Sequence, residues 1–185
     1  YSGKTRLFAE SNPVRVADVD GEGSRIYDGV RTYRRCLVMV DVSKEDSYVL
    51  DLFWVRGGSN HRLIQNAGGP DVTHSGLSLT PQAKGTYAGE NVAFGEFYDG
   101  PKDWDYDGSG FMYLKNVEKG RPRGDFRVDW KLVEPRRDMP KDWEAHLRVH
   151  NLTPVHEAAL CDGIPPEHKG NPERLRYLLR TRFGN

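Results

Sequence analysis

Strict alternation of apolar and polar residues is the feature that most constrains how this chain can fold. Residues 126–132 (Phe-Arg-Val-Asp-Trp-Lys-Leu) alternate without a fault, and residues 143–150 (Trp-Glu-Ala-His-Leu-Arg-Val-His) alternate in the same way. Because successive side chains of a strand point to opposite faces of its sheet, this period of two predicts half-buried strands. Each segment is therefore expected to turn one side to a core and the other to solvent.

Other strands are predicted from short apolar runs. Residues 37–40 and 48–55 are nearly continuous in β-branched, aliphatic and aromatic residues, which is typical of strands covered on both faces. The polar segment 41–47 between them predicts a hairpin. Residues 14–19 fit a further strand before it, whereas residues 67–110 are rich in Gly, Asp, Tyr and Pro and predict extended loops.

One segment near the C-terminus has helical character. Asn171 can cap a helix over residues 172–180, Pro172 suits its first position, and three of its leucines would share one face. Many strands at short spacing with one terminal helix predict an all-β fold. We expect an antiparallel β-sandwich with one short helix near the C-terminus.

Length and composition narrow the classes of protein. The chain has 185 residues, which suits a single domain over residues 1–185, and an aromatic content of 11% separates it from disordered chains. Its 27 Lys and Arg balance 27 Asp and Glu, so no basic excess indicates a nucleic-acid partner. No apolar run approaches the ~20 residues of a membrane span. Since the sequence opens with Tyr1 rather than Met, we expect a piece of a larger protein.

The two alternating segments also carry the candidate binding residues. His146, Arg148 and His150 are two apart on one predicted strand, and Arg127 and Lys131 are the basic residues of the other, with an aspartate between them. If the two strands are neighbours, they form a basic patch suited to carboxylate or sulfate groups. A solvated face with cross-strand charge pairs is the favoured interpretation, and the binding patch is the alternative. A zinc site at His146 and His150 lacks a third ligand, so no metal is expected there.

The segment 103–109 contains two further candidate features. Aspartates at alternate positions followed by a glycine resemble the start of a calcium loop, but the twelfth position is Leu114 instead of the bidentate glutamate. An exposed turn is the favoured interpretation, and a weak calcium site at Asp103, Asp105 and Asp107 is the alternative. Trp104 and Tyr106 in the same loop could stack on sugar rings, as could Tyr113. Trp54 lies in an apolar run and is expected in the core.

The cysteines carry little functional information. Cys36 and Cys161 are far apart in the sequence and match no metal or redox spacing. Two thiols are favoured over one disulfide between them.

A family resemblance adds to these patterns. Residues 33–41 and 48–61 resemble the C-terminal β-sandwich of heparinase II/III-like polysaccharide lyases, in which an Arg-Arg-x-Leu-x-x-Val strand precedes an Asp-x-Phe-x-Val-x-Gly-Gly-x-x-His strand. The segments 108–111, 129–130 and 172–177 are also similar to that group. The likeness thus covers most of the chain.

The resemblance implies a secreted or periplasmic bacterial enzyme that cleaves uronic-acid polysaccharides, such as glycosaminoglycans, by β-elimination. In that family an N-terminal α/α toroid supplies the tyrosine and the Asn or His that abstract the C5 proton and neutralise the carboxylate. Without its toroid the isolated chain is expected to be inactive, to contain no catalytic residue, and to need no cofactor. Its expected partners are the polysaccharide and the toroid.

His61 ends the family's pattern, as a residue near the cleft or as a structural hydrogen-bonding group. A zinc ligand found nearby in some members corresponds here to Asn66, a poor ligand, so no zinc is expected. Alternative functions are a non-catalytic carbohydrate-binding module and a structural sandwich, including a calcium-stabilised one. The expected substrate-binding residues are His61, Trp104, Tyr106, Arg127, Lys131, His146, Arg148 and His150.

Overall fold

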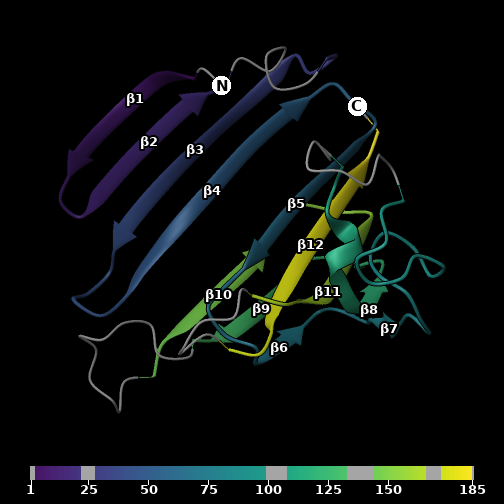
Figure 1. Ribbon diagram of the computed structural model, residues 1–185. Coiled ribbons are helices and arrows are strands. Elements are labelled where there is room, and N and C mark those ends of the chain that lie inside the picture. The colour runs from purple at the N-terminus through teal and green to yellow at the C-terminus, as the bar shows by residue number, and fades with distance from the viewer. Residues whose placement is uncertain (1–2, 22–27, 99–107, 133–143, 166–171, 185) are drawn as a thin grey trace. The chain divides into compact units, whose positions relative to one another are not determined.

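The computed structural model describes residues 3–21, 28–98, 108–132, 144–165 and 172–184 (Figure 1). Within them, the regular elements are β-strands and one short 3-10 helix, η2 (Phe111–Tyr113). Every strand pair whose register is defined is antiparallel. The predicted all-β fold with antiparallel sheets is therefore confirmed.

The chain divides into two compact units, which are described separately. One comprises residues 1–61 with 183–185, and the other comprises residues 62–182. The expectation of a single domain stays a prediction.

The first unit is built on a four-stranded sheet with the order β1-β2-β3-β4 (Figure 1). The β3–β4 hairpin pairs Asp41 with Ser47, and the Val42 N–H donates to the Asp46 carbonyl at 2.9 Å across the turn. The polar segment predicted to connect a hairpin therefore does so. The strands are β1 (Lys4–Ser11), β2 (Val14–Asp20), β3 (Thr32–Asp41) and β4 (Ser47–Arg56).

Strand β4 shows where the apolar-run prediction is wrong. Trp54 is 44% exposed, and Val49 and Leu50, which point to opposite faces of the sheet, are 52% and 46% exposed. The Trp54 ring packs against the guanidinium of Arg34, 5.0 Å from its centroid, instead of inside a core. A continuous apolar run predicts a strand, but it does not tell whether a second layer covers each face.

The second unit contains two sheets. The first has the order β10-β9-β6, from β6 (Val72–Ser75), β9 (Phe126–Lys131) and β10 (His146–Asn151). The second has the order β5-β12-β11-β8-β7. Its strands are β5 (Asn60–Asn66), β7 (Thr80–Pro81), β8 (Leu114–Gly120), β11 (Glu157–Gly163) and β12 (Leu175–Phe183).

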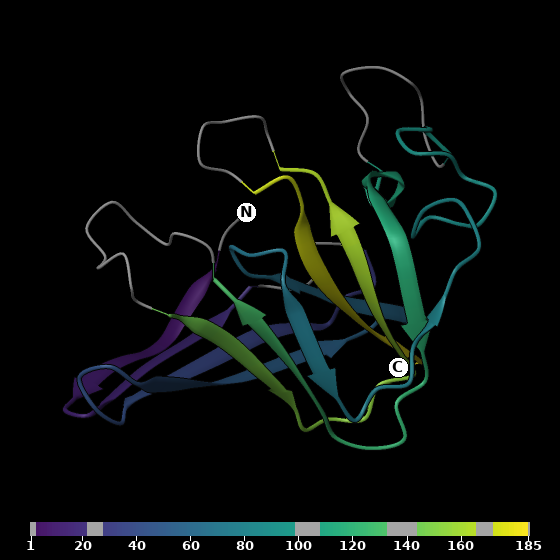
Figure 2. The same ribbon diagram turned by 90° about the horizontal axis from the view of Figure 1, so that it is seen from below.

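The inner faces of these two sheets share one core, which makes this unit a sandwich (Figure 2). Strand β9 contributes its alternate apolar residues, which meet residues of β11 and β12. The largest, Trp130, is fully buried, and its indole N–H donates to the Arg176 carbonyl at 2.7 Å, so its polar atom is satisfied. The buried members are Phe126, Val128, Trp130, Ala158, Leu160 and Leu178.

The five-stranded sheet also has a covered outer face. There a second cluster, Leu114, Val117, Ala159, Cys161 and Leu179, packs against Tyr87, Phe111 and Tyr177. Burial raises the pKa of the Cys161 thiol to about 12. Cys36 and Cys161 are both free thiols, as the sequence favoured.

The predicted C-terminal helix is wrong, because residues 175–183 form strand β12. Leu178 belongs to the inner core and its neighbour Leu179 to the outer cluster, so consecutive leucines point to opposite faces. A strand covered on both faces needs apolar residues at consecutive positions, and three leucines within five residues satisfy a helical face equally well.

Candidate functional site

The two alternating segments are neighbours in the sandwich. Strands β9 and β10 pair antiparallel, with His146 opposite Lys131, Arg148 opposite Asp129 and His150 opposite Arg127. The apolar residues of β9 enter the core, so its alternate polar residues point outward together with those of β10. The predicted patch is thereby assembled. We call it the β9–β10 face: Arg127, Asp129, Lys131, His146, Arg148 and His150.

Asp129 lies at the centre of this face and is only 8% exposed. Its Oδ1 is 2.5 Å from Nδ1 of His146, and its Oδ2 accepts a hydrogen bond of 2.5 Å from Nε of Arg148. Burial alone would raise the pKa of Asp129, but the hydrogen bonds from His146 and Arg148 and their charges outweigh it, so the pKa lies below its ordinary value. Asp129 therefore stays ionised and fixes both side chains of β10.

His146 is held as a cation. While Nδ1 meets Asp129, Nε2 lies 3.1 Å from Oε1 of Glu144. An ionised carboxylate can only accept hydrogen bonds, so both ring nitrogens must carry a proton. The hydrogen bonds to Asp129 and Glu144 accordingly raise the pKa of His146 above its ordinary value. An imidazolium donating through both nitrogens cannot act as a base.

The face keeps a positive balance despite its acidic residues. Lys131 pairs with Glu144 at 2.8 Å. Arg127 and His150 are exposed, and neither forms an ion pair with another residue of the described segments. Asp71 also acts on Lys131 through its charge. The four cations Arg127, Lys131, His146 and Arg148 thus stand against three carboxylates, those of Asp71, Asp129 and Glu144, which leaves one net positive charge.

His61 has a structural partner of its own. Its Nε2 donates to the Gly57 carbonyl at 2.7 Å, in the turn that leads into β5. A Cβ at Gly57, whose φ is +97°, would lie 2.0 Å from the Gly29 carbonyl oxygen, so this turn requires glycine. This geometry supports the structural alternative for His61.

Several expected residues fall outside the described segments. Trp104 and Tyr106, and the aspartates of the calcium alternative (Asp103, Asp105 and Asp107), all lie there. Asn66 is the last residue of β5.

Sequence reasoning missed a buried ionic cluster at the inner face of the five-stranded sheet. Asp162, 1% exposed, accepts hydrogen bonds from Asn116 (2.8 Å), Arg176 (2.9 Å) and Arg174 (3.2 Å). Arg176 also pairs with Glu118. Because every strong donor around Asp162 is used, this cluster is structural. No sequence pattern links strands β8, β11 and β12 at these positions.

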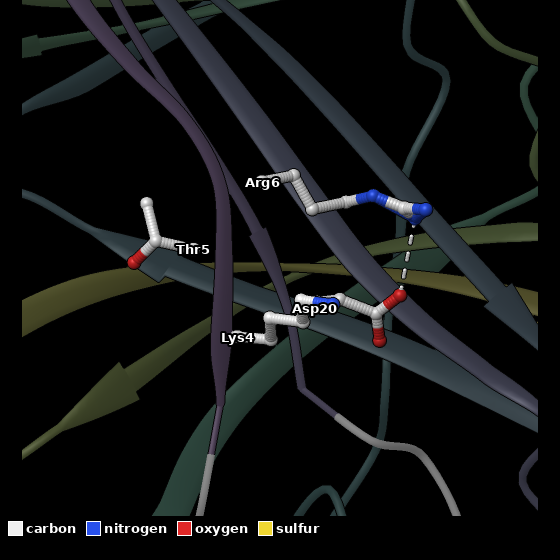
Figure 3. A pocket seen from close by; sticks show the side chains of 4 residues that line it. All are labelled: Lys4, Thr5, Arg6 and Asp20. Carbon is white, nitrogen blue, oxygen red and sulfur yellow. Dashed lines mark hydrogen bonds and ion pairs between the residues drawn. The ribbon is translucent and has the colours of Figure 1, made fainter.

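A hollow in the first unit has no such chemistry. It is lined by Lys4, Thr5, Arg6 and Asp20 at the open end of β1 and β2 (Figure 3). Arg6 pairs with Asp20 at 3.3 Å, but the Arg6 side chain is exposed and that of Asp20 partly so, and the pair therefore contributes little to stability.

Over the described segments, no group of three or more His, Cys, Asp and Glu side chains is arranged to hold a metal ion. No helix within these segments is long and apolar enough to cross a membrane. No known family model matches the chain, and a search of curated proteins found no match.

Proposed function

We propose that the β9–β10 face binds acidic polysaccharide, and that the chain is the C-terminal sandwich of a heparinase II/III-like lyase. The observation that carries the binding proposal is the β9–β10 register, which sets the basic residues of one strand beside those of the other. The assignment to the lyase family is supported by the sequence resemblance alone.

The chemistry of the face suits carboxylate and sulfate groups. Arg127 and Lys131 point outward four residues apart, so the cations of β9 extend over ~13 Å at the usual rise of a strand. The guanidinium of Arg127 is not engaged by any carboxylate of the described segments and can form bidentate hydrogen bonds with a ligand anion. A row of this length fits several sugar units of an acidic chain better than a single one.

The proposal assigns binding, and not proton abstraction, to this face. His146 donates from both ring nitrogens, and Asp129 is hydrogen-bonded twice and has a lowered pKa, so neither is poised as a base. In the lyase the toroid would supply the base, and the substrate would be a uronic-acid polysaccharide outside the cytoplasm. The isolated chain should therefore bind without cleaving.

Calorimetric titration tests the binding proposal. The ligands are heparan-type and alginate-type oligosaccharides and a neutral glucan, each at low and moderate salt. We expect the acidic ligands to bind more tightly than the neutral glucan, and more weakly at moderate salt than at low salt because exposed charges are screened. The double variant Arg127→Ala/Lys131→Ala should bind roughly 2- to 30-fold more weakly, from about 0.2–1 kcal/mol per exposed charge.

The control is Lys44→Ala/Lys84→Ala, which removes two exposed charges from loops elsewhere. It should bind as the unaltered chain does. Equal losses in the two double variants, or equal binding of the neutral glucan, would contradict the proposal. Formation of unsaturated product by the isolated chain, followed by ultraviolet absorbance, would contradict the binding-only role.

A further inference from the structure

A second exposed feature lies where η2 leads into β8. Phe94 and Tyr113 are 49% and 45% exposed, and their rings meet edge to face with centroids 5.7 Å apart and an interplanar angle of 79°. Nζ of Lys115 lies 5.7 Å from the Phe94 centroid. We call these three residues the aromatic platform.

The backbone beneath the platform is fixed. The Gly95 N–H donates to the Met112 carbonyl at 3.1 Å, and Met112 is fully buried. The Tyr113 N–H closes the 3-10 turn onto Gly110, also at 3.1 Å. The Ala93 N–H donates to the Glu96 carboxylate at 2.7 Å, which orders the loop that carries Phe94. Two large apolar side chains are thus held in solvent by backbone that has little freedom.

From this geometry we infer that the aromatic platform binds a sugar ring bearing a carboxylate. A pyranose has an apolar C–H side that suits an aromatic face, and the edge-to-face arrangement presents ring surfaces in two directions. Because the aromatic pair is already ordered, binding costs little conformational entropy. Lys115 beside Phe94 supplies the charge that distinguishes an acidic ring from a neutral one.

The inference shares its ligand class with the proposed function but uses different residues. The β9–β10 face consists of outward side chains of β9 and β10, whereas Tyr113 ends η2, Lys115 lies in β8 and Phe94 lies in the loop before η2. The platform and the β9–β10 face therefore share no residue and no strand. A protein with both sites could hold two polysaccharide molecules at once.

Saturation-transfer NMR on the intact chain tests the inference. A glucuronate disaccharide and the matched glucose disaccharide serve as probes, with saturation applied to the aromatic protons. We expect transfer to ring C–H protons of both sugars, with stronger binding of the acidic one. Tyr113→Ala or Phe94→Ala should weaken binding roughly 2- to 12-fold, the range of an aromatic contact.

Lys115→Ala should weaken only the acidic probe, by roughly 1.4- to 5-fold. Phe8→Ala is the matched control, because Phe8 is 79% exposed in the first unit. Unchanged binding in both platform aromatic variants, or no transfer to either sugar, overturns the inference. Losses in the platform variants while Arg127→Ala/Lys131→Ala binds normally would support the platform and refute the β9–β10 face.

Discussion

Replacement of Asp162 by alanine should strongly destabilise the chain. The side chain of Asp162 is 1% exposed and that of Arg176 is 13% exposed, so the pair sits inside the sandwich. Removing one partner of a buried pair leaves the other charge without compensation and typically costs ~3–5 kcal/mol. Arg176 keeps its contact with Glu118, so we expect the lower end, ~3 kcal/mol. For a chain of this size that corresponds to a melting temperature lower by ~6–12 °C.

Calorimetric melting at neutral pH measures the effect, with Asp51→Ala as the matched control. Arg35 binds Asp51 with two hydrogen bonds of 2.8 and 2.7 Å, but on the exposed surface of the first unit. The control should lose no more than ~1 kcal/mol. If both variants melt at the same temperature, burial does not determine the contribution of the Asp162 pair.

The double variant Asp162→Ala/Arg176→Met gives an independent check. Removing both charges should restore part of the stability lost in Asp162→Ala, since no buried charge is left unpaired.

The contribution of Asp162 to stability should also depend on pH, with a defined sign. Burial alone would raise the pKa of Asp162, but its hydrogen bonds from Asn116 and Arg176 and the arginine charges lower it. Its contribution is therefore complete above the ordinary carboxyl pKa and is lost as the pH falls through the lowered value.

Three further predictions concern other parts of the chain. The stability that His146 contributes should be complete below the ordinary histidine pKa and fall as the pH rises through its raised pKa. Melting curves measured across pH should show this loss in the unaltered chain and not in His146→Gln. Gly57→Ala should lower the melting temperature, because its Cβ would lie 2.0 Å from the Gly29 carbonyl oxygen; an unchanged melting point would contradict this turn geometry. In the native chain a thiol reagent should modify Cys36 and leave the buried Cys161 unmodified, whereas both should react in urea; equal native rates, followed by mass spectrometry, would disprove it.

The sequence was most informative where one face of a strand is buried and the other is not. Alternation over 126–132 identified β9, the residues of its core face and the residues of its outward face. The same signal placed the three basic residues of β10 on one side. It left open only whether the two strands are neighbours, which depends on the turn and the core and not on either strand by itself.

Elsewhere local pattern was insufficient for physical reasons. Strand β12 has apolar residues on both faces, which removes the period of two and produced a false helix. Asp162 and Arg176 are directly opposite each other on β11 and β12, but fourteen residues separate them in the sequence. Their proximity follows from strand register, and no composition or spacing rule expresses it. Glu144, the second hydrogen-bonding partner of His146, lies in an alternating segment. That it contacts His146 depends on where β10 begins, and the alternation does not define that point.

One cross-strand pair distinguishes a binding face from a merely solvated one. A solvated face gains stability by setting opposite charges against each other, as Arg148 and Asp129 do. Arg127 instead lies opposite His150, so no carboxylate stands directly across from its guanidinium. An arginine without an opposite carboxylate adds little to the stability of the sheet, but its guanidinium can hold an anion.

The variant His150→Glu separates the two explanations. It should stabilise the fold by ~0.2–1 kcal/mol, because Arg127 then faces a carboxylate. The same change should weaken binding of acidic oligosaccharides, since the new carboxylate competes for Arg127 and repels the ligand. If the face binds anions, the variant should therefore melt at a higher temperature than the unaltered chain and bind acidic oligosaccharides more weakly. A stabilised variant that binds acidic sugars as well as the unaltered chain would show that this pair serves no ligand.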